Sequence, residues 1–243
     1  MMSMSVVAEN LQRVQERIAA AAARAGRKPD DVTLVAVSKT FPPAAVLDGY
    51  ASGLRHFGEN RVQEAADKIP AVRPLASDAQ WHLIGHLQRN KVKEAVELFS
   101  LVHSVDSFRL AEAISQRSAA SGRRMPVLLE LNLSDEESKT GMRLNDSQTF
   151  WRAVEQICPL PGLQLRGLMT IAALSAQGEG ARPAFRRLRK LQGELAARCG
   201  GEWPQLSMGM SSDYEVAIEE GATLVRIGRA IFGERTDYAP WAS

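Results

Sequence analysis

The chain is poor in the residues that mark metal centres and disulfide-bonded proteins. Its 243 residues include two cysteines and four histidines. Cys158 and Cys199 have neither CxxC spacing nor a neighbouring histidine, so we expect buried or unreactive thiols in a reducing compartment. His82 and His86 have the same parity in an expected strand, but a zinc site needs further ligands. The sequence therefore predicts no bound metal.

Long apolar runs and an excess of charge are also missing. No run approaches the roughly 20 apolar residues that span a bilayer. The segment 1–26 contains Glu9 and Glu16 and lacks the charged-then-apolar order of a secretory signal, which favours a cytoplasmic location. The net charge of +2 offers no general attraction to nucleic acid or to an acidic membrane. The arginine-rich segment 182–198 carries an apolar stripe, which is typical of an outer helix with a solvated basic face.

The chain does contain a regular alternation of short apolar runs with amphipathic segments. An N-terminal helix comes first, with one apolar face made by Val7, Leu11, Val14 and Ile18. Strands are expected at 33–38, 55–59, 81–86, 101–106, 125–133, 163–171, 205–210 and 223–227. Helices are expected at 43–52, 61–69, 90–99, 108–120, 147–157, 184–199 and 212–220. Such alternation predicts parallel strands joined by crossover helices.

Eight strands in a chain of this length match an α/β fold, the (β/α)8 TIM barrel. We expect a single domain over 1–243, with an extra N-terminal helix in 1–30 packing on the barrel and a C-terminal tail at 234–243. An open doubly wound sheet is the alternative, but no GxGxxG or GxxxxGK[ST] loop follows an expected strand. In such a barrel the chemistry is located at the carboxyl ends of the strands. The residues that follow each strand are therefore the candidates for function.

Two lysines and an asparagine follow expected strands. Lys39 follows the first strand, in the stretch TLVAVSKTFPP. Apolar surroundings lower the pKa of a lysine, and a neutral amine can form a Schiff base with a carbonyl. Asn60, after the second strand, is either a helix cap or an amide that faces the ligand of Lys39. Lys139 is a second amine in the loop after the fifth strand, where the acids at 135–137 lack calcium-loop spacing and predict a solvated loop.

The last two strands are followed by features of an anion site. Ser212 and Glu215 have capping-box spacing, so we expect Ser212 to cap a helix whose free N–H groups can bind an anion. Ser207 and Ser211 would add hydroxyl groups, and Gly228 would let backbone amides approach a phosphate closely. TIM barrels frequently bind a phosphate with the loops after these two strands.

A lysine on one side of the barrel mouth and a phosphate site on the other suggest a ligand with an aldehyde at one end and a phosphate at the other. Pyridoxal 5′-phosphate (PLP) fits this description, and Arg226, which can only donate hydrogen bonds, would be the partner of its ring nitrogen. A phosphosugar aldolase could use the same two ends. The residues alone leave both ligands open.

Several stretches resemble the YggS/PROSC family of pyridoxal phosphate homeostasis proteins. They are VAVSKTFP, HFGENRVQE, WHLIGHLQRNK, VHSVDS, ESKTGM, GLMTI and LSMGMSSDYEVAIEEGATLVRIGRAIFG, and they extend from residue 34 to residue 233. The resemblance implies a barrel like the N-terminal domain of alanine racemase, with PLP bound at the strand ends. The chain departs from the family at residues 172–173, which are alanines where prolines are usual, and in the sequence of the fifth strand. These departures affect the rim and none of the implied cofactor contacts.

The resemblance also implies roles for individual residues. Lys39 would carry PLP as a Schiff base, and Asn60 would lie beside the cofactor. Ser207 and the amides around Gly228 and Arg229 would hold the phosphate. Arg226 would face the ring nitrogen and leave it unprotonated, which makes the cofactor a weaker electron sink.

The implied function is to bind PLP for buffering or delivery in vitamin B6 homeostasis. A PLP-dependent amino-acid racemase is the alternative, but a two-base racemase needs a second acid/base opposite the lysine. In enzymes similar to alanine racemase, a tyrosine from an additional domain of the partner subunit fills that role. This chain ends soon after the eighth strand, and Tyr50, Tyr214 and Tyr238 fall in helices or in the tail. We therefore expect a monomeric carrier without catalytic residues, whose partners are PLP and apo forms of PLP-dependent enzymes.

Overall fold

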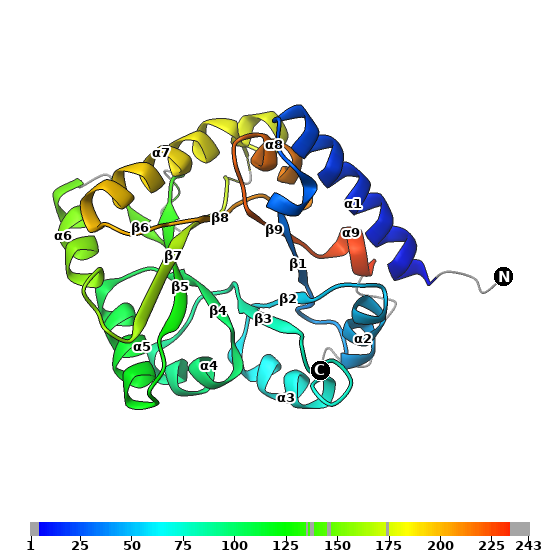
Figure 1. Ribbon diagram of the computed structural model, residues 1–243, viewed down its shortest axis with the longest axis horizontal. Coiled ribbons are helices and arrows are strands. Elements are labelled where there is room, and N and C mark those ends of the chain that lie inside the picture. The colour runs from blue at the N-terminus through cyan, green and yellow to red at the C-terminus, as the bar shows by residue number, and fades with distance from the viewer. Residues whose placement is uncertain (1–4, 135, 137–138, 145–146, 174, 234–243) are drawn as a thin grey trace.

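Parallel strands form a closed ring at the centre of the molecule (Figure 1). The computed structural model describes residues 5–134, 136, 139–144, 147–173 and 175–233. Within them the ring consists of β1 (Thr33–Val37), β2 (His56–Glu59), β3 (Gln80–Leu83), β4 (Leu101–Val105), β5 (Met125–Asn132), β7 (Leu163–Thr170), β8 (Gln205–Ser207) and β9 (Leu224–Ile227). The ring closes because β9 pairs with β1 and β4 pairs with β5. The TIM barrel expected from the sequence is confirmed.

Helices cover the outside of this barrel (Figure 1). They are α1 (Val6–Arg24), α2 (Pro43–Ala51), α3 (Val62–Val72), α4 (Val92–Leu98), α5 (Phe108–Ala120), α6 (Ser147–Ile157), α7 (Arg182–Cys199), α8 (Tyr214–Glu219) and α9 (Arg229–Phe232). Short 3₁₀ turns are η1 (Pro29–Asp31), η2 (Arg89–Lys91) and η3 (Gly178–Ala181). The sequence did not predict the short strand β6 (Met142–Arg143), which pairs with the end of β5. The expected elements are found, with ends that differ by a few residues.

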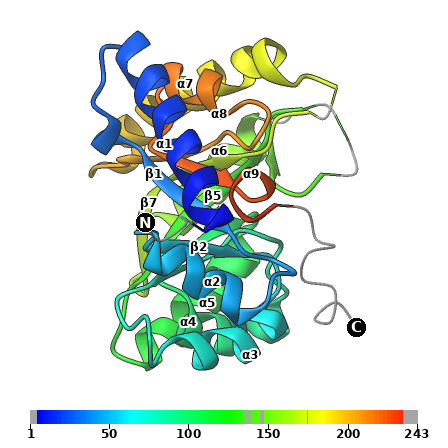
Figure 2. The same ribbon diagram turned by 90° about the vertical axis from the view of Figure 1, so that its right-hand side faces the viewer.

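The N-terminal helix packs where the first and last strands meet (Figures 1 and 2). The side chain of Ser5 caps α1 by accepting a hydrogen bond from the Ala8 amide at 3.2 Å. The expected apolar face is buried, at Val7, Leu11, Val14 and Ile18. The Asn10 amide donates to the Ile231 carbonyl at 3.0 Å, which ties α1 to α9. This helix therefore covers the outer side of the barrel closure.

The arginine-rich helix α7 is an outer helix, as expected. Its apolar stripe is buried, at Phe185, Leu188, Leu191 and Leu195. On its other faces Arg182 lies 2.7 Å from a carboxylate oxygen of Glu220, and Arg186 lies 3.0 Å from the same carboxylate. Acidic residues of α8 and its C-terminal cap thus neutralise part of the basic charge.

The cysteines are not the unpaired thiols expected from the sequence. Cys158 follows α6 directly and Cys199 ends α7, and the two form a disulfide with Cα atoms 6.1 Å apart. They are separated by 41 residues along the chain. The prediction was wrong because spacing rules detect only local pairs, whereas the barrel brings the ends of two consecutive helices together.

The expected capping box at Ser212 is also absent. Helix α8 begins at Tyr214, with Asp213 as its N-cap, and Ser212 is exposed one residue earlier. The Asp213 carboxylate accepts from the Met210 amide at 2.6 Å, and the Asp213 amide donates to the Met210 carbonyl at 3.0 Å. A tight turn before the helix therefore replaces the predicted cap.

The predicted tail at 234–243, with Tyr238, lies outside the described residues, as do the acids at 135 and 137. Among the helices that are described, none is long and apolar enough to cross a membrane.

Candidate functional site

The candidate site lies at the carboxyl ends of the strands, around the junction of β1 and β9. Val35 pairs with Arg226 and Ala36 with Ile227, so the loops after these two parallel strands lie at the same end of the barrel. Lys39 is partly buried in the turn after β1. Gly228 and Arg229 follow β9 directly. Two of the loops expected to hold opposite ends of a ligand are therefore neighbours in space.

A buried cluster of charges lies beneath the Lys39 turn. The Lys68 ammonium, on α3, is fully buried and donates to the Ser38 carbonyl at 2.8 Å. It also lies 2.7 Å from a carboxylate oxygen of Glu59 and 2.7 Å from one of Glu64. We call Lys68, Glu59, Glu64 and Ser38 the Lys68 cluster. The cluster fixes the backbone at the end of β1, from which the Lys39 side chain projects.

The cluster holds the turn on both sides of Lys39. The Ser38 hydroxyl donates to Glu59 at 2.7 Å, and the Thr40 amide donates to Glu64 at 2.5 Å. Thr40 has a φ of 67°, a left-handed conformation that is uncommon for a residue other than glycine. These hydrogen bonds hold Thr40 in that conformation and so define the direction in which Lys39 leaves the strand.

Glu59 is the carboxylate in this cluster whose protonation changes near neutral pH. Burial raises the pKa of Glu59 from 4.5 to about 7, and the nearby Lys68 ammonium opposes the shift. The second Glu59 carboxylate oxygen has no hydrogen-bond partner among the described residues. A single cation faces two carboxylates here, so the cluster is neutral when one of them is protonated.

Sequence reasoning missed Lys68, although a signal was present. Ala65, Ile69 and Val72 form the buried face of α3, and position 68 falls on that same face. A lysine at a core position of an amphipathic helix indicates a buried cation with partners.

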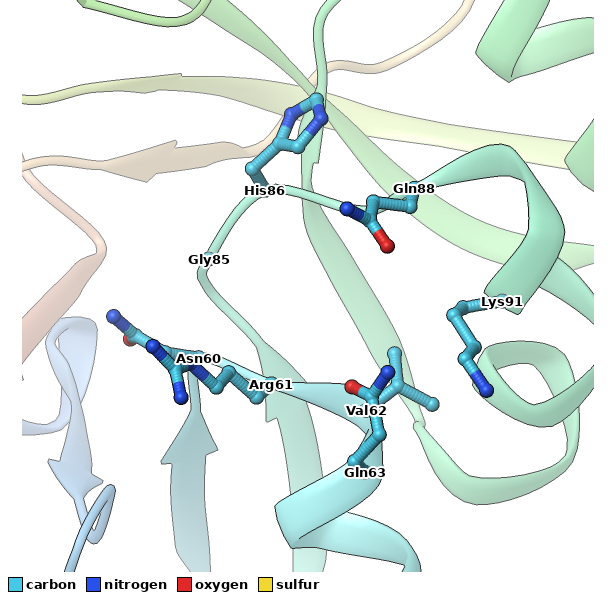
Figure 3. A pocket seen from close by; sticks show the side chains of 8 residues that line it. All are labelled: Asn60, Arg61, Val62, Gln63, Gly85, His86, Gln88 and Lys91. Atoms are coloured by element: carbon cyan, nitrogen blue, oxygen red, sulfur yellow. The ribbon is translucent and has the colours of Figure 1, made fainter.

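Asn60 lines a polar pocket between the loops after β2 and β3 (Figure 3). The cavity has a volume of about 580 Å³ and is lined by Asn60, Arg61, Val62, Gln63, Gly85, His86, Gln88 and Lys91. The two loops touch at Gly85, where a Cβ atom would lie 2.4 Å from the Asn60 carbonyl oxygen. A glycine is required at this position, and the contact fixes the backbone of Asn60 at the barrel mouth.

Arg226 and Ser207 are joined inside the barrel. Arg226 is buried and donates from Nη1 to Ser207 Oγ at 2.6 Å and from Nη2 to the Thr170 carbonyl at 2.9 Å. Burial lowers the pKa of Arg226 to about 10, against the opposing charges of Asp213 and Glu130. Arg226 is therefore a fixed cation at neutral pH. The Ser207 hydroxyl is fully buried and also contacts His103 Nδ1 at 2.8 Å, a partner that the sequence did not indicate.

The end of β9 lies close against the end of β1. A Cβ atom at Gly228 would lie 3.1 Å from the Val37 carbonyl oxygen, so a small residue allows this approach. The first amides of α9 have no carbonyl acceptor within that helix. Ser211 and Ser212, in the turn after β8, are exposed. These amides and hydroxyls are groups that can bind an anion at the barrel mouth.

The second expected amine is held on the opposite side of the ring. Lys139 Nζ donates to the Ala172 carbonyl at 3.0 Å and lies 3.1 Å from a Glu136 carboxylate oxygen. These contacts join the loop after β5 to the loop after β7. Nearby, the Thr140 hydroxyl donates to Glu130 at 2.7 Å, and burial raises the pKa of that carboxyl group.

Histidines 82 and 86 do not form a metal site. His82 is buried, whereas the His86 side chain is 51% exposed and its Nδ1 lies 3.2 Å from an Asp106 carboxylate oxygen. Across the described residues, no group of three or more His, Cys, Asp or Glu side chains is arranged to hold a metal ion.

Comparison with known proteins shows which family the chain is similar to. The family model described as alanine racemase, N-terminal domain, matches residues 9–236. The pyridoxal phosphate homeostasis protein of Pseudomonas aeruginosa is 46% identical over 237 residues, which cover 98% of this chain and 99% of that protein. The protein of the same name from Aquifex aeolicus is 44% identical over 227 residues and 93% of this chain, and 97% of its own length is covered.

A solved structure shows the same similarity. PipY of Synechococcus elongatus, determined with PLP bound, has a TM-score of 0.82 and 38% sequence identity to this chain. The match covers 93% of this chain and 100% of that structure.

Proposed function

Because the chain belongs to the pyridoxal phosphate homeostasis protein family, with an alanine racemase N-terminal-type barrel, we propose that it binds PLP for intracellular buffering or delivery. The observation that carries the proposal is that Lys39, in the turn after β1, and Arg226, on β9, come from neighbouring strands. The similar PipY structure contains PLP, which supports the same ligand here.

The residues at the mouth fit the parts of PLP. Lys39 supplies the amine that would join the aldehyde as a Schiff base, and the Lys68 cluster orients its turn. Asn60 would lie beside the ring, at a mouth position fixed by its contact with Gly85. Arg226 would face the ring nitrogen as a donor. When bound, PLP supplies an aldehyde for this linkage and a ring that withdraws electrons.

The phosphate would be bound by the loops after β8 and β9. Its proposed partners are the amides around Gly228 and Arg229 and the Ser207 residue. Because the Ser207 hydroxyl already contacts Arg226 and His103, a phosphate contact by this side chain would compete with those bonds. The exposed hydroxyls of Ser211 and Ser212 are free of that competition.

The site supports a carrier in preference to a racemase. Arg226 remains a cation at neutral pH and can only donate, so it would leave the ring nitrogen unprotonated and limit carbanion stabilisation. Neither described tyrosine is positioned as a second acid/base. The Tyr50 hydroxyl donates to Asp78, and Tyr214 is buried with its ring 5.3 Å from the Arg17 guanidinium carbon. A monomer in the cytoplasm, without nucleic-acid or membrane partners, belongs to the same proposal.

The first test is the covalent link. Purified protein incubated with PLP is expected to absorb in the visible range, and borohydride is expected to fix one reduced PLP on the Lys39 peptide, as measured by mass spectrometry. Lys39→Ala should lose both signals, while Lys139→Ala, which changes the other amine, should keep them. A wild-type protein with no affinity for PLP would refute the proposed function.

The second test separates carrier from enzyme. L-amino acids are supplied to the loaded protein and D-products are measured. Product many times above the protein concentration, lost in Lys39→Ala, would refute the carrier. Delivery is tested by mixing the loaded protein with an apo PLP-dependent enzyme and a trap for free PLP. Activation despite the trap is the result expected for direct transfer.

A further inference from the structure

A line of hydrogen-bonded side chains crosses the interior of the barrel and ends at Arg226. His56 Nδ1 lies 3.0 Å from His82 Nε2, and His82 Nδ1 lies 2.9 Å from His103 Nε2. His103 Nδ1 lies 2.8 Å from Ser207 Oγ, which accepts from Arg226 Nη1 at 2.6 Å. We call His56, His82, His103 and Ser207 the histidine chain.

The histidine chain connects strands that are distant around the ring. His56, His82 and His103 lie on the consecutive strands β2, β3 and β4, and Ser207 lies on β8. Because β5 and β7 separate β4 from β8 on the shorter way round, the contact between His103 and Ser207 spans the barrel interior. His56 is the first residue of β2 and is half-buried, whereas the Ser207 end reaches the candidate site.

The three imidazoles are neutral at physiological pH. Burial lowers the pKa of His82 to about 3 and that of His103 well below 6.5, and it also lowers the pKa of His56. A neutral imidazole has one N–H donor and one acceptor nitrogen. Each link of the histidine chain therefore has a direction.

Arg226 determines that direction. A guanidinium can only donate, so Ser207 Oγ accepts from Arg226. Among the described residues the other partner of this hydroxyl is His103 Nδ1, so the hydroxyl donates to that nitrogen. The proton of His103 is then on Nε2 and faces His82, and the proton of His82 is on Nε2 and faces His56. The opposite order would leave the buried Ser207 hydroxyl without an acceptor, which is unfavourable.

We propose that the histidine chain positions Arg226 and holds all three imidazoles as Nε2–H tautomers, so that His56, at the far end, is linked to the cofactor site. The positioning of Arg226 depends only on residues of this protein. Its effect on PLP binding rests on the proposed function. The occupied Ser207 oxygen fixes one guanidinium nitrogen and the Thr170 carbonyl fixes the other. These two hydrogen bonds fix the plane of the guanidinium group and so the directions of its remaining N–H donors.

The tautomers can be measured without PLP. Long-range ¹H–¹⁵N correlation spectra of the unliganded protein are expected to show the Nε2–H tautomer for His56, His82 and His103. His82 and His103 should not titrate between about pH 6 and pH 8. His86, with its exposed side chain, provides the internal control for a histidine outside the chain. An Nδ1–H tautomer at His82 or His103 would overturn the proposal.

Two substitutions of His103 test the positioning of Arg226. His103→Leu removes the acceptor of Ser207, whereas His103→Asn keeps an amide oxygen near the Nδ1 position. We expect His103→Leu to weaken PLP affinity about tenfold, the effect of losing one hydrogen bond in a network that holds a charged group. His103→Asn should stay within about threefold of the wild type, even where both variants lose similar thermal stability.

The outcomes separate positioning from mere packing. Equal losses of PLP affinity in the two variants, in proportion to their losses of stability, would refute positioning. If neither variant folds, His56→Leu at the half-buried end is used. Because Arg226 sets the direction, His82 should stay an Nε2–H tautomer, while its Nε2–H resonance shifts because the acceptor is lost. An unchanged Nε2–H chemical shift, or a change of the His82 tautomer, would contradict the link. If wild-type protein fails to bind PLP, the proposed function fails while the tautomer spectra still decide the histidine chain.

Discussion

Two buried polar regions support two residues of the candidate site, Lys39 and Arg226, and they do so by different means. The Lys68 cluster beneath Lys39 is charged and compact, and its contacts join residues at most 30 positions apart in the sequence. The histidine chain behind Arg226 is neutral and includes a contact between residues 104 positions apart. The Lys68 cluster holds the backbone of the turn that contains Lys39, whereas the histidine chain holds the guanidinium group of Arg226.

The difference lies in how each region responds to the loss of one member. Removing one charge from a buried cluster leaves other charges uncompensated in a medium that solvates them poorly. Removing one residue from the neutral histidine chain costs a hydrogen bond and leaves each neighbouring side chain with one hydrogen-bond partner fewer. The charged region should therefore be the more sensitive to substitution and to pH.

The largest effect is expected at the centre of the charged region. Lys68→Met leaves Glu59 and Glu64 without their cation, and we expect a loss of about 3–5 kcal/mol in the free energy of unfolding. Urea unfolding at pH 8 measures this. Lys190→Met, at a side chain that is 81% exposed, is the control and should change stability by less than about 0.5 kcal/mol. A loss below about 1 kcal/mol for Lys68→Met would show that the cluster is not held as a charged unit.

The neutral region should respond more weakly. Ser207→Ala removes the acceptor of Arg226 Nη1, a hydrogen bond to a charged group, and we expect about 2 kcal/mol of destabilisation. Ser211→Ala changes an exposed hydroxyl in the turn after β8 and should be within about 0.5 kcal/mol of the wild type. If Ser207→Ala destabilised the protein as much as Lys68→Met, the contrast between the two regions would be lost.

The smallest effect at neutral pH, and the most specific, concerns Glu59. The folded pKa of Glu59 is raised to about 7 from 4.5, so the folded protein keeps a proton that the unfolded chain releases between these values. This contribution to stability is present below pH 4.5 and is lost as the pH rises through about 7. Glu59→Gln cannot titrate, so the difference in melting temperature between wild type and variant should shift in favour of the variant across that range.

A matched control keeps this measurement specific. Glu97→Gln alters a carboxylate that is 54% exposed and should leave the pH dependence of the melting temperature unchanged. Parallel curves for wild type and Glu59→Gln from pH 4.5 to pH 8 would contradict the raised pKa and remove the pH sensitivity from the comparison.

The sequence predicted the barrel and the approximate positions of its strands because both follow from local patterns. Apolar runs and amphipathic segments alternate regularly, and Lys39 and Arg226 are polar residues at or beside the ends of such runs. Strand pairing then brings the loops after β1 and β9 together. These residues could be selected from the chain because their positions depend on one strand each.

The supporting residues could not be found in the same way. His103 lies in the fully buried strand LVHSV, and nothing in that run indicates that its ring meets Ser207 on the other side of the barrel. The disulfide between Cys158 and Cys199 likewise depends on the placement of two helices. Contacts of this kind depend on the exact placement of side chains across the barrel and between helices, which a single sequence does not reveal.

The pairing of β1 with β9 also has a consequence for synthesis of the protein. The first strand leaves the ribosome long before the last, and the segments that carry Lys39 and Arg226 become neighbours only when the last strand pairs with the first. Until then β1 and β8 both have an unpaired edge, a form prone to association with other chains. The proposed site therefore needs both β1 and β9, so a partial chain without β9 would lack one side of it.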